Sequence, residues 1–237
     1  MTISLTVLME EEALYDDLYT GNICTLLIET DNLVSIVNPG GAPDALIYNI
    51  KRLVKNIEEK IYVIITTFIP RYWSALSIIC KSFPVNSIIV PKFRTYISHK
   101  LSRYLNKLNM DNIVEISDKL DIEHVTIMNI SSQTYSELIL IVDDSVMIST
   151  PSLWMLAQDC LNNILTRLGN FKFNYYIGGV PLLPDIIREH AIFIRRFFNK
   201  FERVYIGNIR TRSSRNILDK FPINIKILRT GLKLAVS

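Results

Sequence analysis

The sequence predicts an α/β domain built mostly on mixed β-sheets. Strand-like apolar runs alternate along the chain with segments of helical spacing, and this alternation occurs twice, once in each half. Between the halves there is no stretch rich in proline and glycine that would mark a linker. The chain has 237 residues, 49% of them hydrophobic, so it is long enough to bury a large core. We therefore expect one domain over residues 1–237.

The first half begins with a run of predicted strands. Residues 3–8 alternate apolar and polar side chains, and residues 22–30 and 33–37 read as a hairpin around Asp31-Asn32. A tight loop over residues 38–41 then leads into a helix that starts at Pro43, a residue favoured in the first helical turn, and ends near residue 56. The rest of this half is expected to hold strands over 61–65, 87–90 and 112–116, a helix ending near 81, and a helix over 94–108.

The second half opens with an antiparallel meander and then repeats the alternation. Strands are expected over 124–130, 136–142 and 145–148, the last two joined by Asp143-Asp144. Residues 149–152 have the composition of a helix start, which predicts a helix to residue 168. The remaining expected elements are strands over 173–177, 203–206, 224–228 and 232–236, and helices over 184–198 and 211–220.

The formal net charge of +3 is unevenly spread along the chain. Residues 1–60 carry ten acidic and four basic side chains, whereas residues 188–237 carry twelve basic and three acidic ones. Such a basic C-terminal quarter can face nucleic acid, an acidic partner protein, or the acidic N-terminal quarter of its own chain. The charge pattern alone leaves these three uses open.

The cysteines and the apolar runs indicate the cellular compartment in which the protein is expected. Cys24, Cys80 and Cys160 lie far apart in apolar contexts, as expected of buried thiols in a reducing compartment. The longest apolar runs are strand-sized and too short for a membrane span, so we expect no membrane partner. Residues 1–9 lack a basic flank and lead into an acidic triplet, which argues against a signal peptide and predicts a cytoplasmic protein.

The most informative stretch runs from Val63 to Leu76. An apolar strand breaks at Thr66-Thr67 and passes through Pro70 into a helical pattern, and such strand-to-helix junctions are where α/β proteins gather binding groups. The stretch resembles the metal-binding loop of the metallo-β-lactamase superfamily. In that loop an apolar strand and Ser/Thr precede His-x-His-x-Asp-His, a pair of small residues and Leu. The frame fits here without a gap.

Further landmarks of that superfamily occur in the same order. In the superfamily a strand ends in Asp-Thr-Gly, and Asn38 occupies the position of that Asp. The superfamily also has a Gly-Cys-Ser-His turn that opens a helix, and the position of its His falls near Leu153. The run Ile177-Gly178-Gly179-Val180-Pro181-Leu182 matches Gly-Gly-Phe-His-Leu with Pro181 at the His, and the last ligand loop falls near residues 207–209. The resemblance covers nearly the whole chain and implies an αββα four-layer sandwich.

Every metal-ligand position implied by the resemblance is replaced. The His-x-His-x-Asp-His positions hold Thr67, Ile69, Arg71 and Tyr72, none of which is a good ligand for zinc, manganese or iron. The chain's three histidines, His99, His124 and His190, occupy none of the ligand positions. We therefore expect no cofactor and a catalytically degenerate, metal-free protein. Such a protein would act as a binding or assembly subunit, with an active paralogue or another protein as its partner.

The vacated metal site still has polar residues. Arg71 places a permanent cation where the family has an anionic ligand, so the site can hold a phosphate or carboxylate near a helix start without activating water. The other residues expected around this anionic small molecule are Asn38, Thr66, Thr67, Tyr72 and Asn208. The alternative is that Arg71 only fills the hole by pairing with a nearby carboxylate.

Two other functions remain open. One is a hydrolase of the same fold that acts on a phosphate ester or nucleic acid through a relocated or metal-independent site. The other is a nucleic-acid-binding module in which Arg210, Arg212 and Arg215 of the basic C-terminal quarter meet successive phosphates. The nucleotide-binding motifs Gly-x-x-x-x-Gly-Lys-Ser/Thr and Gly-x-Gly-x-x-Gly do not occur, nor does a Gly-x-Ser-x-Gly nucleophile turn.

Overall fold

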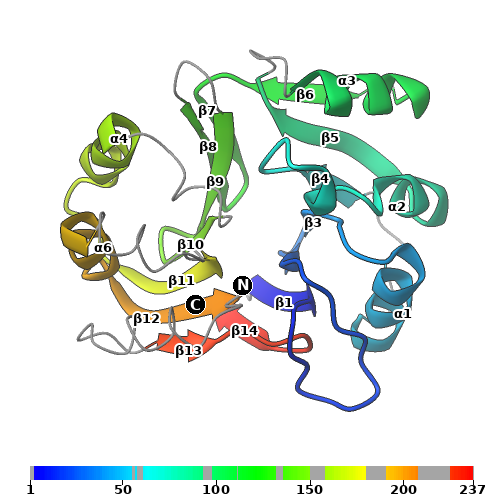
Figure 1. The fold of residues 1–237 in the computed structure, drawn as a ribbon, viewed down its shortest axis with the longest axis horizontal. Helices are drawn as coiled ribbons and strands as arrows, with labels where there is room; N and C mark the ends of the chain where they lie inside the picture. The colour runs from blue at the N-terminus through cyan, green and yellow to red at the C-terminus, as the bar shows by residue number, and fades with distance from the viewer. Residues whose placement is uncertain are drawn as a thin grey trace.

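The protein is described here from a computed structural model. The structure describes residues 3–54, 57, 61–92, 98–110, 112–131, 136–149, 158–179, 191–207 and 225–236. Two seven-stranded sheets form its centre, and the two chain ends lie close together between them (Figure 1).

Each sheet is mixed and continuous. The spatial order of the first sheet is β14 (Lys233–Val236), β1 (Ile3–Met9), β2 (Thr25–Glu29), β3 (Val34–Val37), β4 (Ile61–Ile64), β5 (Val85–Pro91) and β6 (Ile113–Ile116). The order of the second sheet is β13 (Ile225–Ile227), β12 (Phe201–Gly207), β11 (Phe173–Gly179), β10 (Val146–Ser149), β9 (Ser136–Val142), β8 (Val125–Ser131) and β7 (Lys119–Ile122).

Both sheets change from antiparallel to parallel pairing part of the way across. In the first sheet β14, β1, β2 and β3 pair antiparallel, and β3 to β6 are parallel. In the second sheet β7 to β10 are antiparallel, and β10 to β13 are parallel. Because parallel strands end at the same edge, the loops after β3 and β4 meet at one edge of the first sheet, and the strands β10, β11 and β12 end at one edge of the second.

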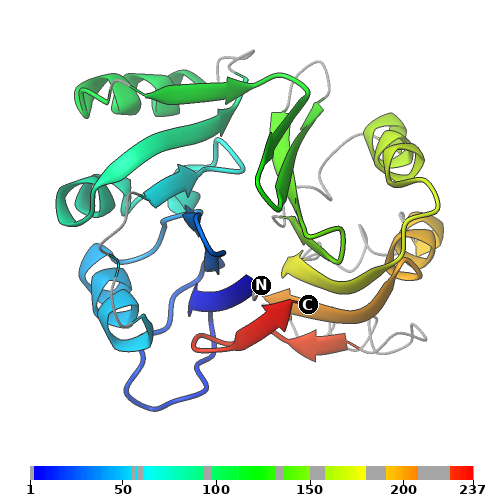
Figure 2. The ribbon, with the colours of Figure 1, turned by 180° about the vertical axis from the view of Figure 1, so that it is seen from behind.

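Helices cover the outer face of each sheet, as both views show (Figures 1 and 2). Those on the first sheet are α1 (Pro43–Leu53), α2 (Leu76–Ser82) and α3 (Ser98–Lys107), and those on the second are α4 (Gln158–Leu168) and α6 (Ala191–Phe198). One apolar cluster joins the two sheets, including Leu5, Leu26 and Leu138, while separate clusters lie under the two helical layers. The αββα four-layer arrangement expected from the sequence is therefore confirmed.

The helical layers differ in their side chains. The first is packed largely with aliphatic residues such as Ile36, Leu46 and Leu101. The second is rich in aromatic rings, with Tyr176 and Phe197 meeting edge to face at 5.4 Å between ring centroids. None of the described helices is both long enough and apolar enough to cross a membrane.

The expected elements differ from the structure in a few places. The sequence did not predict the short strand β7, because its Lys and Asp side chains weaken the alternating strand pattern. In the structure β7 pairs with β8 across a turn in which Glu123 has a φ of 50°. Gly178-Gly179 extends β11 rather than following it. A 3₁₀ turn over Pro70–Tyr72 separates β4 from α2. The expected helix starts at 149–152 and 184 and the helix over 211–220 fall largely or wholly outside the described residues.

Candidate functional site

Asn38 ties together the ends of three strands at the site. Its backbone has a φ of 54°, a left-handed conformation that asparagine tolerates better than most residues. The Asn38 side-chain oxygen accepts hydrogen bonds from the Thr66 backbone N–H (2.9 Å) and hydroxyl (3.0 Å). The Asn38 backbone carbonyl accepts one from the Thr25 hydroxyl at 2.7 Å. Asn38 and Thr66 are 3% and 0% exposed, so these contacts fix the buried junction between β2, β3 and β4.

The loop after β3 packs tightly on the loop after β4. The Ala75 N–H donates to the Pro39 carbonyl at 2.9 Å, and the Ser74 hydroxyl donates to the Gly41 carbonyl at 3.0 Å. A Cβ atom at Gly40 would lie 2.1 Å from the Arg71 carbonyl oxygen, so only glycine fits there. This close packing holds the backbone of residues 70–75 in one position.

Arg71 and Tyr72 occupy the turn between β4 and α2. The Arg71 guanidinium lies over the Tyr72 ring, 4.9 Å from its centroid, and Nη2 donates to the Tyr72 hydroxyl at 3.1 Å. Arg71 Nε is buried, and among the described residues it has no hydrogen-bond partner and Arg71 forms no ion pair with a carboxylate. The guanidinium is therefore held in place by a ring and one hydroxyl, with donor capacity left over.

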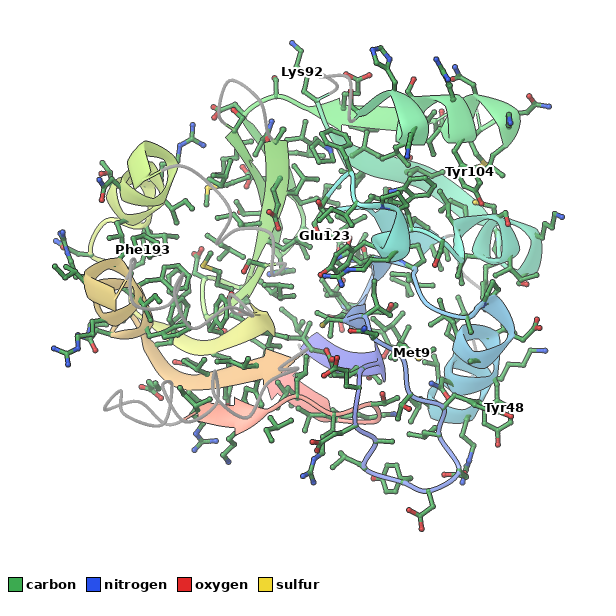
Figure 3. All side chains as sticks on the ribbon, in the orientation of Figure 1. Met9, Tyr48, Lys92, Tyr104, Glu123 and Phe193 are labelled. Atoms are coloured by element: carbon green, nitrogen blue, oxygen red, sulfur yellow. The ribbon has the colours of Figure 1, made fainter. Side chains whose placement is uncertain are left out.

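Trp73 turns away from this point. Its indole N–H donates to the Phe68 carbonyl at 3.3 Å, and its ring packs against Tyr104 of α3 with centroids 5.0 Å apart. Figure 3 shows Tyr104 in the helical layer outside the first sheet. Trp73 is thus part of the outer core and does not plug the space between the sheets.

Three further ionisable groups approach the site from distant segments. Glu10 follows β1, Cys24 precedes β2, and Glu137 lies in β9; they are 1%, 8% and 0% exposed. Burial, and then the charge and hydrogen bonding of Glu10, raise the pKa of the Cys24 thiol well above its usual value. Burial is also the main reason that the pKa of Tyr72 is raised, with Glu137 and Cys24 adding to it and Arg71 opposing it. No sequence motif singles out these three residues.

The first sheet contacts the second directly beside these groups. The Leu138 N–H donates to the Thr66 carbonyl at 2.8 Å, and Thr67 and Glu137 form an isolated β-bridge. The side chain of Thr67 is fully buried. The two threonines thus link β4 to β9 as well as bordering the site.

On the second sheet the site is bordered by the ends of β10, β11 and β12. The hydroxyls of Ser149 and Tyr176 share a hydrogen bond of 2.6 Å. A Cβ at Gly207 would lie 2.0 Å from Glu10 Oε2, so the end of β12 approaches the first sheet closely. The loops after these strands lie outside the described residues, and with them Leu153, Pro181, Asn208 and the expected nucleic-acid contacts Arg210, Arg212 and Arg215.

The residues at this edge do not fit a metal ion of the kind the fold family uses. The described positions that match the family's ligand loop offer hydroxyls and a guanidinium. Glu10, Cys24 and Glu137 approach the site, but no cluster of three His, Cys, Asp or Glu that could hold a metal occurs in the described part of the chain. His124 lies in the β7–β8 turn, where its Nδ1 is 3.4 Å from Asp143 Oδ1, and His99 lies on α3. His190 falls outside the described residues.

Similar solved structures share this architecture along the whole chain. Tm1679, described as a metal-dependent hydrolase of the β-lactamase superfamily, matches with a TM-score of 0.70 and 15% identity over 99% of each chain. A diphosphatase from the PhnP family matches with a TM-score of 0.62 and 12% identity over 99% of this chain and 98% of that one. The metallo-β-lactamase fold protein YhfI from Bacillus subtilis matches with a TM-score of 0.57 and 10% identity over 99% of each chain.

These likenesses establish the fold. The chain has the metallo-β-lactamase fold, as the motif spacing indicated. No protein-family model matches the sequence. A sequence comparison with curated proteins also finds no match. The function must therefore be argued from the residues at the site.

Proposed function

We propose that this chain is a catalytically degenerate, metal-free protein of the metallo-β-lactamase fold that binds an anion beside Arg71 and acts as a binding or assembly subunit. The observation that carries the proposal is the Arg71 guanidinium. It is fixed on Tyr72, its Nε is buried without a hydrogen-bond partner, and no carboxylate among the described residues pairs with it. A buried donor on a permanent cation is costly unless something accepts from it.

Two donors at this place are available to an anion, even with the buried carboxylates of Glu10 and Glu137 near the site. The Asn38 amide nitrogen donates to none of the described residues, while the Asn38 oxygen is used by Thr66. The free donors at this edge therefore come from an amide and a guanidinium. An oxyanion such as phosphate or carboxylate accepts from both and forms charge-assisted hydrogen bonds with the guanidinium.

The same chemistry argues against a relocated hydrolytic centre in the described part of the site. The Cys24 thiol acts electrostatically on Tyr72, and its pKa is raised by burial and by Glu10, which opposes formation of a nucleophilic thiolate. The described residues bring no histidine to this edge that could activate Thr66, Thr67 or Ser149. A binding role needs none of these groups.

Anion binding is tested by thermal unfolding in inorganic phosphate and pyrophosphate, with chloride at matched ionic strength. We expect stabilisation that grows with the logarithm of the ligand concentration and reaches about 2.7 kcal/mol at about 100 times the Kd. Arg71→Gln should abolish it, whereas Arg103→Gln on the exposed face of α3 should retain it. Equal stabilisation of the two variants would refute the Arg71 site.

The metal-free and non-catalytic parts of the proposal are tested separately. Elemental mass spectrometry on protein purified without chelators should give far less than one zinc, manganese or iron per chain. Turnover of phosphate-ester or nuclease substrates should be absent. Stoichiometric metal would overturn the metal-free assignment, and turnover that survives chelators but disappears in Arg71→Gln would replace the binding role with an enzymatic one.

A nucleic-acid-binding role is the second candidate, and one cluster of cations favours it. Burial, then the charges of Lys172 and Arg196, lower the pKa of Lys200, so positive groups gather where β11 and β12 begin. Lys172 Nζ donates to the Asn199 carbonyl at 3.0 Å and Lys200 Nζ to that of Gly169, which fixes both amines at the surface. Single-stranded RNA should bind with an affinity that falls steeply with salt, and less steeply in Lys172→Gln. A flat salt dependence would remove this candidate.

A further inference from the structure

A cavity of about 680 Å³ lies on the outer side of the first sheet, away from Arg71. It opens between the loop that joins β1 to β2, the C-terminal end of α1 and the start of β14. In Figure 1 the loop between β1 and β2, drawn in dark blue, lies below α1. Apolar side chains make up much of the lining; the residues around the cavity are Leu14, Tyr15, Asp17, Leu18, Glu29, Arg52, Leu53, Val54, Gly231, Leu232 and Lys233.

Three of the four charged side chains in the cavity already have partners. Arg52 Nε donates to Asp17 Oδ2 at 2.7 Å, and Lys233 Nζ donates to the Leu53 carbonyl at 2.8 Å. Glu29 is different: its carboxylate has no hydrogen bond and no ion pair with any residue that the structure describes. It is half-buried at the end of β2, where a carboxylate without a partner destabilises the fold.

The rim of the cavity is aromatic and acidic. Leu14 and Tyr15 are 43% and 57% exposed, and beside them Tyr19 and Tyr48 meet edge to face with ring centroids 5.1 Å apart. Figure 3 shows Tyr48 on the outward side of α1. The exposed Asp16 lies in the same loop. Exposed tyrosines gathered around a pocket with apolar and charged walls are typical of protein-binding surfaces.

The loop is held rigidly in spite of its exposed side chains. Asn49 of α1 is fully buried; its amide nitrogen donates to the Leu8 carbonyl (2.9 Å) and the Tyr19 carbonyl (2.8 Å), and its oxygen accepts from the Tyr19 N–H at 3.0 Å. On the other side, the Leu14 N–H donates to the Thr230 carbonyl at 2.9 Å. The pocket is therefore preformed, and a ligand need not order it.

We propose that this pocket receives an arginine or lysine side chain from a partner protein. Glu29 pairs with the cation, the apolar wall of Leu18 and Leu232 packs against the aliphatic stem, and Tyr15 contacts the residues on either side. The occupant is basic because Glu29 is the one charged side chain in the cavity without a hydrogen bond or ion pair among the described residues; the charge of Lys233 acts on it, but the Lys233 amine is held by the Leu53 carbonyl. It belongs to a protein because the aromatic rim extends well beyond the volume of a single cation.

This proposal goes beyond the Arg71 site and does not depend on anion binding there. Its test uses the peptide acetyl-Gly-Leu-Arg-Leu-Gly-amide and two-dimensional amide NMR of the full chain. Saturable shifts are expected at Leu14, Leu18 and Gly231. The same peptide with citrulline, the neutral isostere of arginine, should bind about tenfold more weakly, the equivalent of 1.4 kcal/mol.

A matched pair of variants assigns the effect to Glu29. Glu29→Gln should weaken the arginine peptide to the level of the citrulline peptide, whereas Glu202→Gln, an exposed acid on the second sheet, should leave the affinity unchanged. Equal binding of the arginine and citrulline peptides would overturn the proposal. So would binding of n-butylguanidine as tightly as the peptide, because the pocket would then be a site for small cations rather than for a protein segment.

Discussion

The loops after β3 and β4 and the loop between β1 and β2 belong to the same sheet but differ in what they do with their polar groups. In the first pair of loops the polar groups bond to each other: the Asn38 side chain accepts a hydrogen bond from Thr66, and Gly40 lies against the Arg71 backbone. We call these the closed loops. The loop between β1 and β2 is fixed at anchors such as the buried Asn49 and the exposed Arg52–Asp17 ion pair, and its tyrosines face solvent. A closed loop preserves a scaffold, whereas an anchored open loop presents a surface to a partner.

The closed region should be the more sensitive to added volume. In Gly40→Ala the new Cβ would meet the Arg71 carbonyl oxygen at 2.1 Å and Ile23 Cδ1 at 2.7 Å. Since neither the backbone nor the buried Ile23 can move far, we expect a loss of about 3 kcal/mol or more of unfolding free energy, measured by urea denaturation.

Gly169→Ala is the matched control for this effect. Gly169 has a φ of +49°, but the nearest atom to an added Cβ is 3.9 Å away. Here only the left-handed backbone opposes the substitution, at about 1–2 kcal/mol. A Gly40→Ala variant no less stable than Gly169→Ala would show that the loops after β3 and β4 are not closely packed.

Asn49→Ala should convert the anchored loop into a loose one. It removes three hydrogen bonds and leaves the Leu8 and Tyr19 backbone groups without their partner, which we expect to cost about 2 kcal/mol. Hydrogen exchange at the Tyr19 amide should quicken, and the arginine peptide should bind more weakly. Asn106→Ala, at an exposed position of α3, should change neither quantity. Unchanged exchange at Tyr19 would mean that the loop is held by other contacts.

The sequence predicted the closed loops better than the open one. Strand periodicity and Pro43 depend on neighbouring residues, so most strands and α1 could be predicted from local pattern, while the four layers came from the resemblance to the metallo-β-lactamase superfamily. The role of Asn49 could not, because a polar residue in a helix usually faces solvent and only tertiary structure brings the Tyr19 backbone to it.

The acidic side of the site was missed for the same reason. Glu10, Cys24 and Glu137 come from segments that are far apart in the sequence, and each lies in a strand-end context that has no motif. Their convergence depends on the two sheets meeting face to face. Similarly, whether Arg71 pairs with an acid depends on which side chains the fold brings close to it. No acidic side chain among the described residues forms an ion pair with Arg71.

Tyr72→Phe probes the closed region electrostatically. The substitution removes the hydroxyl that accepts from Arg71, so a loss of about 1 kcal/mol is expected at pH 8. The pKa of Tyr72 is raised above its ordinary value of 10.0, so the folded state favours the neutral phenol and the native protein should lose stability as the pH rises above about 10. Urea denaturation at pH 8 and 10.5 should show a smaller alkaline loss in Tyr72→Phe. Tyr48→Phe, with a ring 43% exposed, is the control.

The smallest expected effect has the opposite sign and belongs to the open region. Burial raises the pKa of Glu29, with Lys233 opposing it, so the folded state favours the protonated acid. The stabilisation is present below the unfolded pKa of about 4.5 and is lost as the pH rises through the folded value. Glu29→Gln should therefore be more stable than the native protein at pH 7, by less than about 1 kcal/mol because the side chain remains half solvated. The difference should vanish at pH 3.5.

A gain of stability from Glu29→Gln together with weaker peptide binding would separate the two regions most clearly. A carboxylate that destabilises the fold at neutral pH has no structural use in the cavity, so its value to the protein lies in what it binds. If Glu29→Gln instead destabilised the protein at pH 7, Glu29 would have a structural partner, and the open loop would resemble the closed ones in satisfying its own polar groups. Thermal unfolding of Glu29→Gln and Glu202→Gln at pH 3.5 and pH 7 distinguishes these outcomes, because Glu29 lines the cavity and Glu202 does not.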